Sequence, residues 1–261
     1  MSEMSLVDCD SPLVTHVHPS PNFEERRNGA RASILLMHYT GLASCVRAID
    51  WLSRPESKVS CHYVIDADGT IWQMVAENKR AWHAGVGSWH GDCDINSASI
   101  GIEIHNPGHD GGYPDFPEVQ MSAVTALSAD IITRNGIRPE RVLAHSDIAP
   151  GRKIDPGEKF DWARLARAGI GHWVDPEPAG PVAESISVLP ADADRITQTQ
   201  TLLRRYGYGI EVTGESDKQS RTVVAAFQRH FRQERVDGLV DASTFITLQR
   251  LIAGLGEPIV S

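Results

Sequence analysis

The chain contains 261 residues, of which 41% are hydrophobic and 23% are charged, and this composition suits one or two globular domains rather than a disordered chain. Its formal net charge of −9 argues against a general attraction to nucleic acid or to an anionic membrane surface. The four cysteines form no CxxC pair, which favours reduced or buried thiols over a disulfide framework.

The N-terminal segment Met1–Ser5 lacks a basic stretch followed by an apolar run, so it does not have the pattern of a signal peptide. No stretch approaches the roughly 18 apolar residues of a membrane span. We therefore expect no membrane span and a cytoplasmic protein. The alternative is a protein of the periplasm or cell envelope whose leader has been removed.

The first part of the chain alternates strand patterns with helix patterns. Short apolar or alternating runs predict strands at residues 34–37, 61–65, 70–75, 100–104 and 142–144. Asp68-Gly69 marks the turn of a hairpin between the second and third of these strands. Helical patterns occupy residues 46–52 and 117–136, the latter with proline at its first turn and glycine at its end. The sum is an α/β fold with a mixed central sheet flanked by helices.

The second part of the chain follows a proline-rich segment without periodicity, residues 174–184, which we interpret as a linker. Helical stripes then recur, including Val223, Phe227 and Phe231 at intervals of four, and Asp241 is a candidate cap for a last helix. We therefore predict two domains, residues 1–173 and 185–261. The second is a small three-helix domain whose aromatic stripe forms its core.

Two predicted strands end in histidine, at His38 and His145, and Asp155 follows His145 after ten residues in a loop rich in proline and glycine. Such a bent loop can return a carboxylate toward the histidine before it. Two imidazoles and one carboxylate suit zinc and leave a position for water, whose pKa zinc lowers to roughly 7.

Two further residues fit the hydrolysis of an amide. Glu103 lies on a strand whose isoleucines 100, 102 and 104 take the opposite face, so its carboxylate is a candidate general base. Lys153 is a candidate for stabilising the negative oxygen that develops. Each residue is also compatible with a structural role: a hydrogen-bonded histidine, a solvated glutamate, or an aspartate in a turn. The spacing leaves both interpretations open.

The same residues carry a resemblance to a known family. The segments concerned are Met37–Thr40, Ser60–Ile65, Asp68–Thr70, Ala81–Gly85, Ser99–Glu103 and Ala144–Gly157. In this order they resemble the type-2 N-acetylmuramoyl-L-alanine amidases over roughly residues 30–172. Related phage and animal proteins have a catalytic tyrosine before the histidine of the hairpin strand and a cysteine as third ligand, and Cys61 and Asp155 stand at these two positions here. The chain therefore resembles the glutamate-using bacterial branch, and Cys61 is not expected to bind zinc.

The resemblance implies specific roles for eight residues. Zn²⁺ is expected on His38, His145 and Asp155, with Glu103 as catalytic acid and base and Lys153 beside the scissile carbonyl. Trp82, His83 and Asn106 are expected to line the substrate groove, although His83 is also compatible with a structural role. The tail resembles the small helical peptidoglycan-binding domain over residues 195–252.

The function implied is zinc-dependent hydrolysis of the amide between N-acetylmuramic acid, or its 1,6-anhydro form, and L-alanine. The partner is then peptidoglycan polymer or muropeptide fragments. The wall-binding tail favours polymer, whereas the N-terminus favours recycling of anhydro-muropeptides in the cytoplasm. Two alternatives are a non-catalytic peptidoglycan-recognition protein on the same fold and a metal hydrolase of another amide.

Overall fold

The computed structural model describes residues 9–180 and 192–255. The chain forms two compact units, one made of residues up to 85 together with 94–143, and the other of residues 86–93 together with those from 144 onward. The predicted domain boundaries at residues 173 and 185 stay predictions. The N-terminal segment Met1–Ser5 and the end of the predicted linker, residues 181–184, lie outside the described residues.

The fold contains a six-stranded mixed sheet with the order β1-β5-β4-β7-β3-β8. The strands are β1 (His16–Val17), β5 (Ile71–Gln73), β4 (Tyr63–Ile65), β7 (Ser99–Ile104), β3 (Ile34–Tyr39) and β8 (Val142–Ala144). Strands β4 and β5 pair antiparallel, which confirms the predicted hairpin, whereas β7 runs parallel to both β3 and β4. A separate antiparallel pair, β2 (Phe23–Glu25) with β6 (Lys79–Ala81), did not stand out in the sequence.

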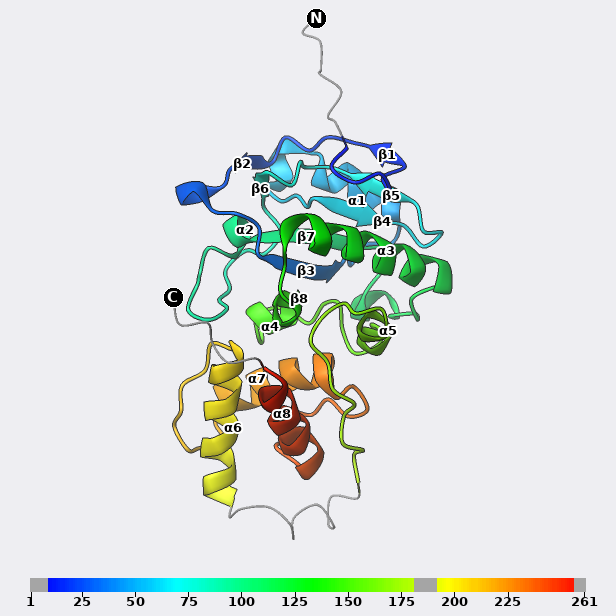
Figure 1. The fold of residues 1–261 in the computed structure, drawn as a ribbon. Helices are drawn as coiled ribbons and strands as arrows, with labels where there is room; N and C mark the ends of the chain where they lie inside the picture. The colour runs from blue at the N-terminus through cyan, green and yellow to red at the C-terminus, as the bar shows by residue number, and fades with distance from the viewer. Residues whose placement is uncertain (1–8, 181–191, 256–261) are drawn as a thin grey trace, which may run out of the picture. The chain divides into compact units, whose positions relative to one another are not determined.

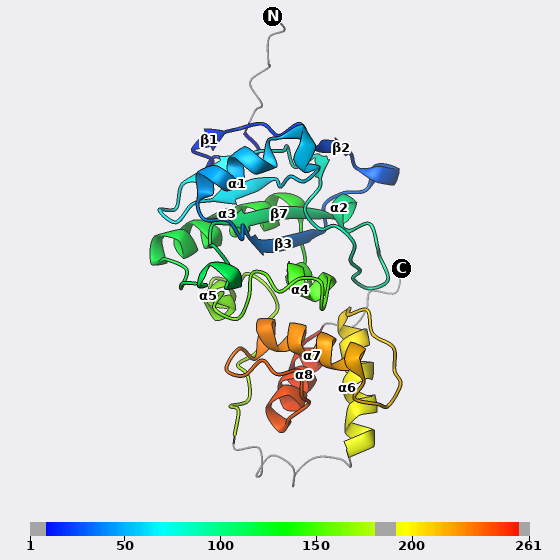
Figure 2. The ribbon, with the colours of Figure 1, turned by 180° about the vertical axis from the view of Figure 1, so that it is seen from behind.

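The central strands are apolar because both of their faces are covered. The first four residues of β3, and the isoleucines of β7, are fully buried. Helices α1 (Cys45–Leu52) and α3 (Glu118–Asn135) lie on opposite faces of this sheet (Figures 1 and 2). Helix α3 ends at Gly136, whose φ of 65° is the left-handed conformation that glycine adopts readily at a helix end.

Shorter elements complete the first unit. They are helix α2 (Ile95–Ala98) and the 3₁₀ turns η1 (Arg27–Gly29), η2 (Pro55–Ser57), η3 (His109–Gly111) and η4 (Pro139–Arg141). The side chains of α1 that face the sheet join a core cluster, which comprises Cys45, Ile49, Leu52, Cys61, Val64 and Met74.

The second unit is helical. It contains α4 (His145–Ile148), α5 (Trp162–Arg167), α6 (Asp192–Tyr206), α7 (Lys218–Phe231) and α8 (Ala242–Gly254). The last three confirm the predicted three helices of the tail, and Asp241 caps α8 by accepting from the Thr244 amide at 2.7 Å. The aromatic stripe of α7 is buried, as expected for core residues.

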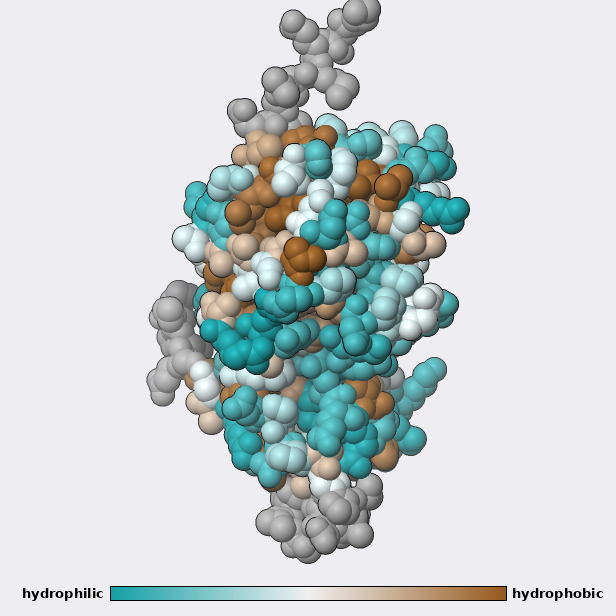
Figure 3. All heavy atoms as spheres, turned by 90° about the vertical axis from the view of Figure 1, so that its right-hand side faces the viewer, coloured by the Kyte–Doolittle hydropathy of each residue, from teal (hydrophilic) through white to brown (hydrophobic). Residues whose placement is uncertain are grey.

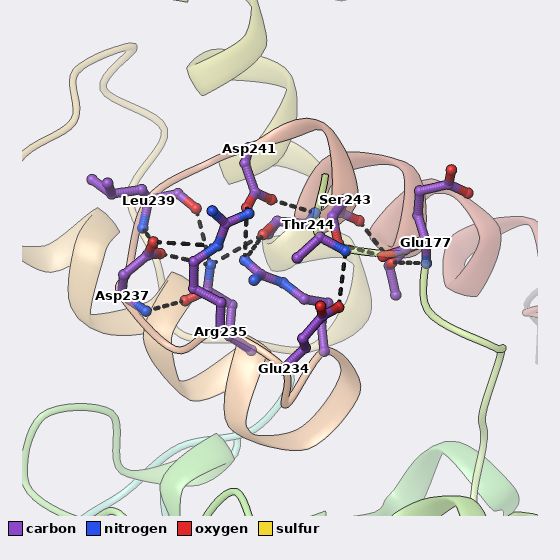
Figure 4. Close-up of polar contacts among 12 residues, drawn as sticks. Glu177, Glu234, Arg235, Asp237, Leu239, Asp241, Ser243 and Thr244 are labelled. Carbon is purple, nitrogen blue, oxygen red and sulfur yellow. Dashed lines mark hydrogen bonds and ion pairs between the residues drawn. The ribbon is translucent and has the colours of Figure 1, made fainter. Parts of the chain in front are cut away.

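The described part of the predicted linker contacts the start of α8 (Figure 4). The Glu177 carbonyl accepts a hydrogen bond from Ser243 at 2.5 Å, and the Ala179 amide donates to Glu234 at 2.9 Å. Nearby, Arg235 forms an ion pair with Asp241 at 2.9 Å. Residues 177–180 are thus held in place by backbone and side-chain hydrogen bonds.

The surface seen in Figure 3 is mainly hydrophilic, and apolar residues lie on it in separate patches. Among residues 9–180 and 192–255, no helix is both long enough and apolar enough to cross a membrane. All four cysteines are free thiols, of which Cys45 and Cys61 are buried.

Candidate active site

The site is built in part from two parallel strands. His38 near the end of β3 is the register partner of Glu103 on β7. In a parallel pair, register partners point to the same face of the sheet, so the two side chains lie next to each other. The neighbouring isoleucines of β7 are buried on the opposite face, which confirms the alternation expected from the sequence.

The three predicted metal ligands come together. His38, His145 and Asp155 each offer a ligand atom within 4.8 Å of the other two, and all three are buried, with exposures of 1%, 2% and 6%. His145 is the first residue of α4, and its Nδ1 lies 3.0 Å from Oδ2 of Asp155. The Ser146 amide also donates to the Asp155 carbonyl at 3.0 Å, which ties the returning loop to the helical turn.

His83 contacts one of these ligands. Its Nδ1 lies 3.0 Å from Nε2 of His38, and its Nε2 lies 3.3 Å from Oγ of Ser99. The His83 ring rests on Gly101, where an added Cβ would lie 2.4 Å from Nδ1. The glycine in the middle of β7 is therefore the residue that admits His83 beside His38.

A further histidine, His62, lies beside His83. The rings of His62 and His83 are 5.4 Å apart, and the Gly101 amide donates to Nδ1 of His62 at 3.0 Å. Burial, assisted by the positive charge of Arg26, lowers the pKa of His62 to about 3. His62 is therefore neutral at ordinary pH and accepts the backbone hydrogen bond.

Cys61 lies close to Glu103 without belonging to the ligand set. Burial, and then the charge of Glu103, raise the pKa of the Cys61 thiol well above its ordinary value. That Cys61 is not a ligand stays a prediction.

The remaining predicted residues occupy defined places. Lys153 is half-buried in the loop between the two second-unit ligands, and its amide donates to the Ala149 carbonyl at 3.0 Å. Trp82 is half-buried, and its amide bonds Oγ of Ser60 at 2.8 Å. Asn106 is buried, and its side chain is engaged with its own loop, donating to the Pro114 carbonyl at 2.9 Å. The substrate roles of Trp82, His83 and Asn106 stay predictions.

Two residues near the ligands were not singled out from the sequence. Arg152 places a guanidinium nitrogen 3.4 Å from Nε2 of His145 and donates from Nε to the Val86 carbonyl at 2.9 Å. Asp147 is fully buried two residues after His145. Both belong to the segment 144–157 that carried the resemblance. Their closeness to His145 in the sequence was the one indication that they lie near the ligands.

The donor set fits zinc. Two imidazoles and one carboxylate are typical ligands of a catalytic zinc site, which keeps a further position for water. Their burial and mutual proximity match what one ion requires. A buried cluster of this composition on an α/β fold is compatible with the metal site of a hydrolase.

Comparison with known proteins gives the family. The family model described as N-acetylmuramoyl-L-alanine amidase matches residues 28–158, and a peptidoglycan binding domain model matches residues 192–248. The chain is 36% identical over 242 residues to the N-acetylmuramoyl-L-alanine amidase AmiD of Escherichia coli K12, covering 87% of this chain and 84% of AmiD. The chain belongs to the N-acetylmuramoyl-L-alanine amidase family.

Solved structures agree with this assignment. The complex of E. coli AmiD with anhydro-N-acetylmuramic acid-L-Ala-D-gamma-Glu-L-Lys matches with a TM-score of 0.73 at 35% identity, covering 88% of this chain and 92% of that one. AmpDh3 from Pseudomonas aeruginosa also gives 0.73 at 35% identity, covering 86% and 92%. The 1,6-anhydro-N-acetylmuramyl-L-alanine amidase AmpD of Citrobacter freundii is 38% identical over 165 residues, covering 56% of this chain and 86% of AmpD.

Proposed function

We propose that this protein uses zinc to hydrolyse the amide between the lactyl group of N-acetylmuramic acid, or of its 1,6-anhydro form, and L-alanine. The observation that carries the proposal is the buried cluster of His38, His145 and Asp155, with Glu103 in register beside His38. This cluster lies in a chain of the amidase family, and the E. coli relative was solved with an anhydro-muramyl peptide described as its substrate.

The three ligands would hold the ion, which when bound supplies Lewis acidity and lowers the pKa of water to about 7. Glu103 accepts the proton as the water oxygen bonds to the amide carbon. The same carboxyl group then gives this proton to the nitrogen of L-alanine as the C–N bond breaks. Lys153 provides positive charge for the oxygen of the tetrahedral intermediate.

The test of the general base is Glu103→Gln, which keeps size and removes the basic carboxylate. We expect kcat to fall by about 10²- to 10⁴-fold, the usual contribution of a positioned acid–base group. Zinc content should stay at the wild-type value because Glu103 is not a proposed ligand. The matched control is Glu56→Gln, an exposed glutamate of η2. Full activity in Glu103→Gln would remove Glu103 from the mechanism.

The chemical outcome also separates the alternative functions. Product analysis by mass should show a free amino group on L-alanine and an intact lactyl carboxylate. A protein that binds muropeptides and zinc but releases no product would be a recognition protein on this fold. A product cut at another amide would make it a hydrolase of different specificity.

We propose both polymer and anhydro-muropeptides as the substrate class. The match of residues 192–248 to a peptidoglycan binding domain supports polymer, and the anhydro-muramyl ligands of the related structures support fragments. Incubation with intact sacculi and, separately, with anhydro-muropeptides gives the preference as a ratio of kcat/KM values. The cytoplasmic location, with periplasm or cell envelope as its alternative, stays a prediction that cell fractionation measures.

A further inference from the structure

The second unit contains a buried carboxylate that the proposed chemistry does not use. Asp147 is fully buried and lies in the helical turn that begins at His145. Its Oδ2 accepts from the Ala144 amide at 2.8 Å. Two further donors come from much later in the chain, since Oδ1 accepts from the Tyr208 hydroxyl and Oδ2 from Nδ1 of His230, each at 2.6 Å.

Aromatic packing holds both distant donors. The buried Tyr208 ring lies 4.9 Å from the ring of Trp89, edge to face. The His230 ring stacks on Trp162 at 3.7 Å and on Phe231 at 3.8 Å. Burial raises the pKa of Tyr208 well above its ordinary value, so the phenol remains protonated and donates. Rings held on their faces and edges cannot rotate away from Asp147 without losing this packing.

The same turn carries one proposed ligand and is hydrogen-bonded to the loop of another. His145 is its first residue, and the Ser146 amide bonds the Asp155 carbonyl at 3.0 Å. A rotation of the turn would therefore move the His145 imidazole and the Asp155 loop together. Groups that orient metal ligands from outside the ligand set commonly alter metal affinity or activity by about 10- to 100-fold when removed.

We propose that Tyr208 and His230 are positioning residues, which hold Asp147 and thereby fix the turn that presents His145 to the metal. The inference rests on the proposed function, because it concerns the same metal site. It assigns the C-terminal segment a second task beside wall binding. His230 in α7 and Tyr208 after α6 would thus help to position His145, which lies much earlier in the sequence.

The first test is Tyr208→Phe, which deletes the hydroxyl and keeps the ring on Trp89. Zinc affinity is measured by competition with a chelator, and the absorption of the Co²⁺-substituted protein reports ligand geometry. We expect zinc affinity to fall about tenfold and the Co²⁺ bands to shift. The matched control is Tyr206→Phe, because the Tyr206 hydroxyl bonds Nδ1 of His172 at 3.0 Å in the same segment. The control should keep both readouts at the wild-type values.

The second test is a pair at position 230. His230→Phe keeps a ring between Trp162 and Phe231 but removes the donor, whereas His230→Asn offers an amide N–H near the position of Nδ1. We expect the phenylalanine variant to lose zinc affinity and the asparagine variant to recover most of it. Should Tyr208→Phe fail to fold, this pair decides alone, because a role in packing only would favour the ring over the amide.

Wild-type affinity and wild-type Co²⁺ spectra in both Tyr208→Phe and His230→Phe would overturn the inference. So would an equal loss in the Tyr206→Phe control. Failure of the proposed function has a different signature, since the unmodified protein would then bind no zinc and release no product.

Discussion

Gly101→Ala is a single-methyl test of the site geometry. Position 101 lies in β7, and its φ is not in the left-handed region, so the backbone itself accepts alanine. The added Cβ would lie 2.4 Å from Nδ1 and 2.6 Å from Cε1 and Cγ of His83. These atoms belong to a rigid ring, so the ring as a whole must move away from the strand.

The cost of this movement has two sources, the crowding of a packed site and the hydrogen bonds that the ring must break. Overpacking a buried site costs about 1–3 kcal/mol, and each buried hydrogen bond contributes about 1 kcal/mol. His83 bonds both His38 and Ser99, so loss of both hydrogen bonds adds about 2 kcal/mol to the overpacking, and we expect the free energy of unfolding to fall by about 3–5 kcal/mol. Because His38 loses a partner that orients its ring, zinc affinity should fall by about 10-fold or more.

Urea unfolding of the zinc-free protein gives the first quantity, and chelator competition gives the second. The double variant Gly101→Ala/His83→Ala identifies the cause, because removing the ring removes the clash. Its stability should then be higher than the sum of the two single losses predicts by the whole loss of Gly101→Ala, about 3–5 kcal/mol, because neither the clash nor the His83 hydrogen bonds exist once the ring is removed. Strictly additive losses, or a Gly101→Ala protein as stable as the wild type, would refute the proposed contact between methyl and ring.

Three further predictions follow from the same structure. Removing zinc with a chelator should lower the free energy of unfolding by about 2.7 kcal/mol, relative to protein with free zinc at 100 times its dissociation constant. Added zinc should restore the lost stability. A thermal midpoint that does not change on removal would contradict a bound metal. Because burial lowers the pKa of His62 to about 3, the unfolded state binds an extra proton below about pH 6.5, so stability falls as the pH falls from about 6.5 to about 3. In the zinc-free protein, His62→Gln should make that slope shallower by about 1.4 kcal/mol per pH unit in urea titrations between pH 4 and 6, and equal slopes would contradict this. Gly207→Ala places a Cβ 2.5 Å from the Trp89 ring at a φ of +134°, and in urea unfolding it should destabilise the protein by about 2–4 kcal/mol. The control is Gly91→Ala, at a φ of +82° with no atom within 4 Å of the added Cβ. It should cost only about 1 kcal/mol of backbone strain in the same unfolding measurement.

Much of the fold could be predicted because its signals are local. The apolar run at 34–37 and the alternation at 100–104 report burial directly, and the structure confirms β3 and β7 there. The turn at Asp68-Gly69 and the cap at Asp241 need only their neighbours in the chain. The separate pair β2–β6 escaped notice because its strands, Phe-Glu-Glu and Lys-Arg-Ala, are mostly charged and contain no apolar run.

The candidate ligands were also within reach of the sequence, for a related reason. His38 and His145 each end an apolar run, and Asp155 follows in a loop with little freedom. What sequence could not supply was their proximity, which depends on the order β7-β3-β8 in the sheet. The role of Gly101 could not be predicted either, because a glycine in a strand has several possible explanations. The structure distinguishes them by showing the His83 ring packed against Gly101.

The hydrogen bonds of Asp147 show where local reasoning ends. A buried carboxylate must find donors, so the residue itself indicates that partners exist. Tyr208 and His230 lie 61 and 83 residues away along the chain, in a segment that the periodicity assigned wholly to a separate core. A helical stripe distinguishes buried from exposed positions but does not say which buried polar atom faces which. Tyr208 and His230 are buried in the second unit and also donate hydrogen bonds to Asp147, and only the folded structure reveals that they do both.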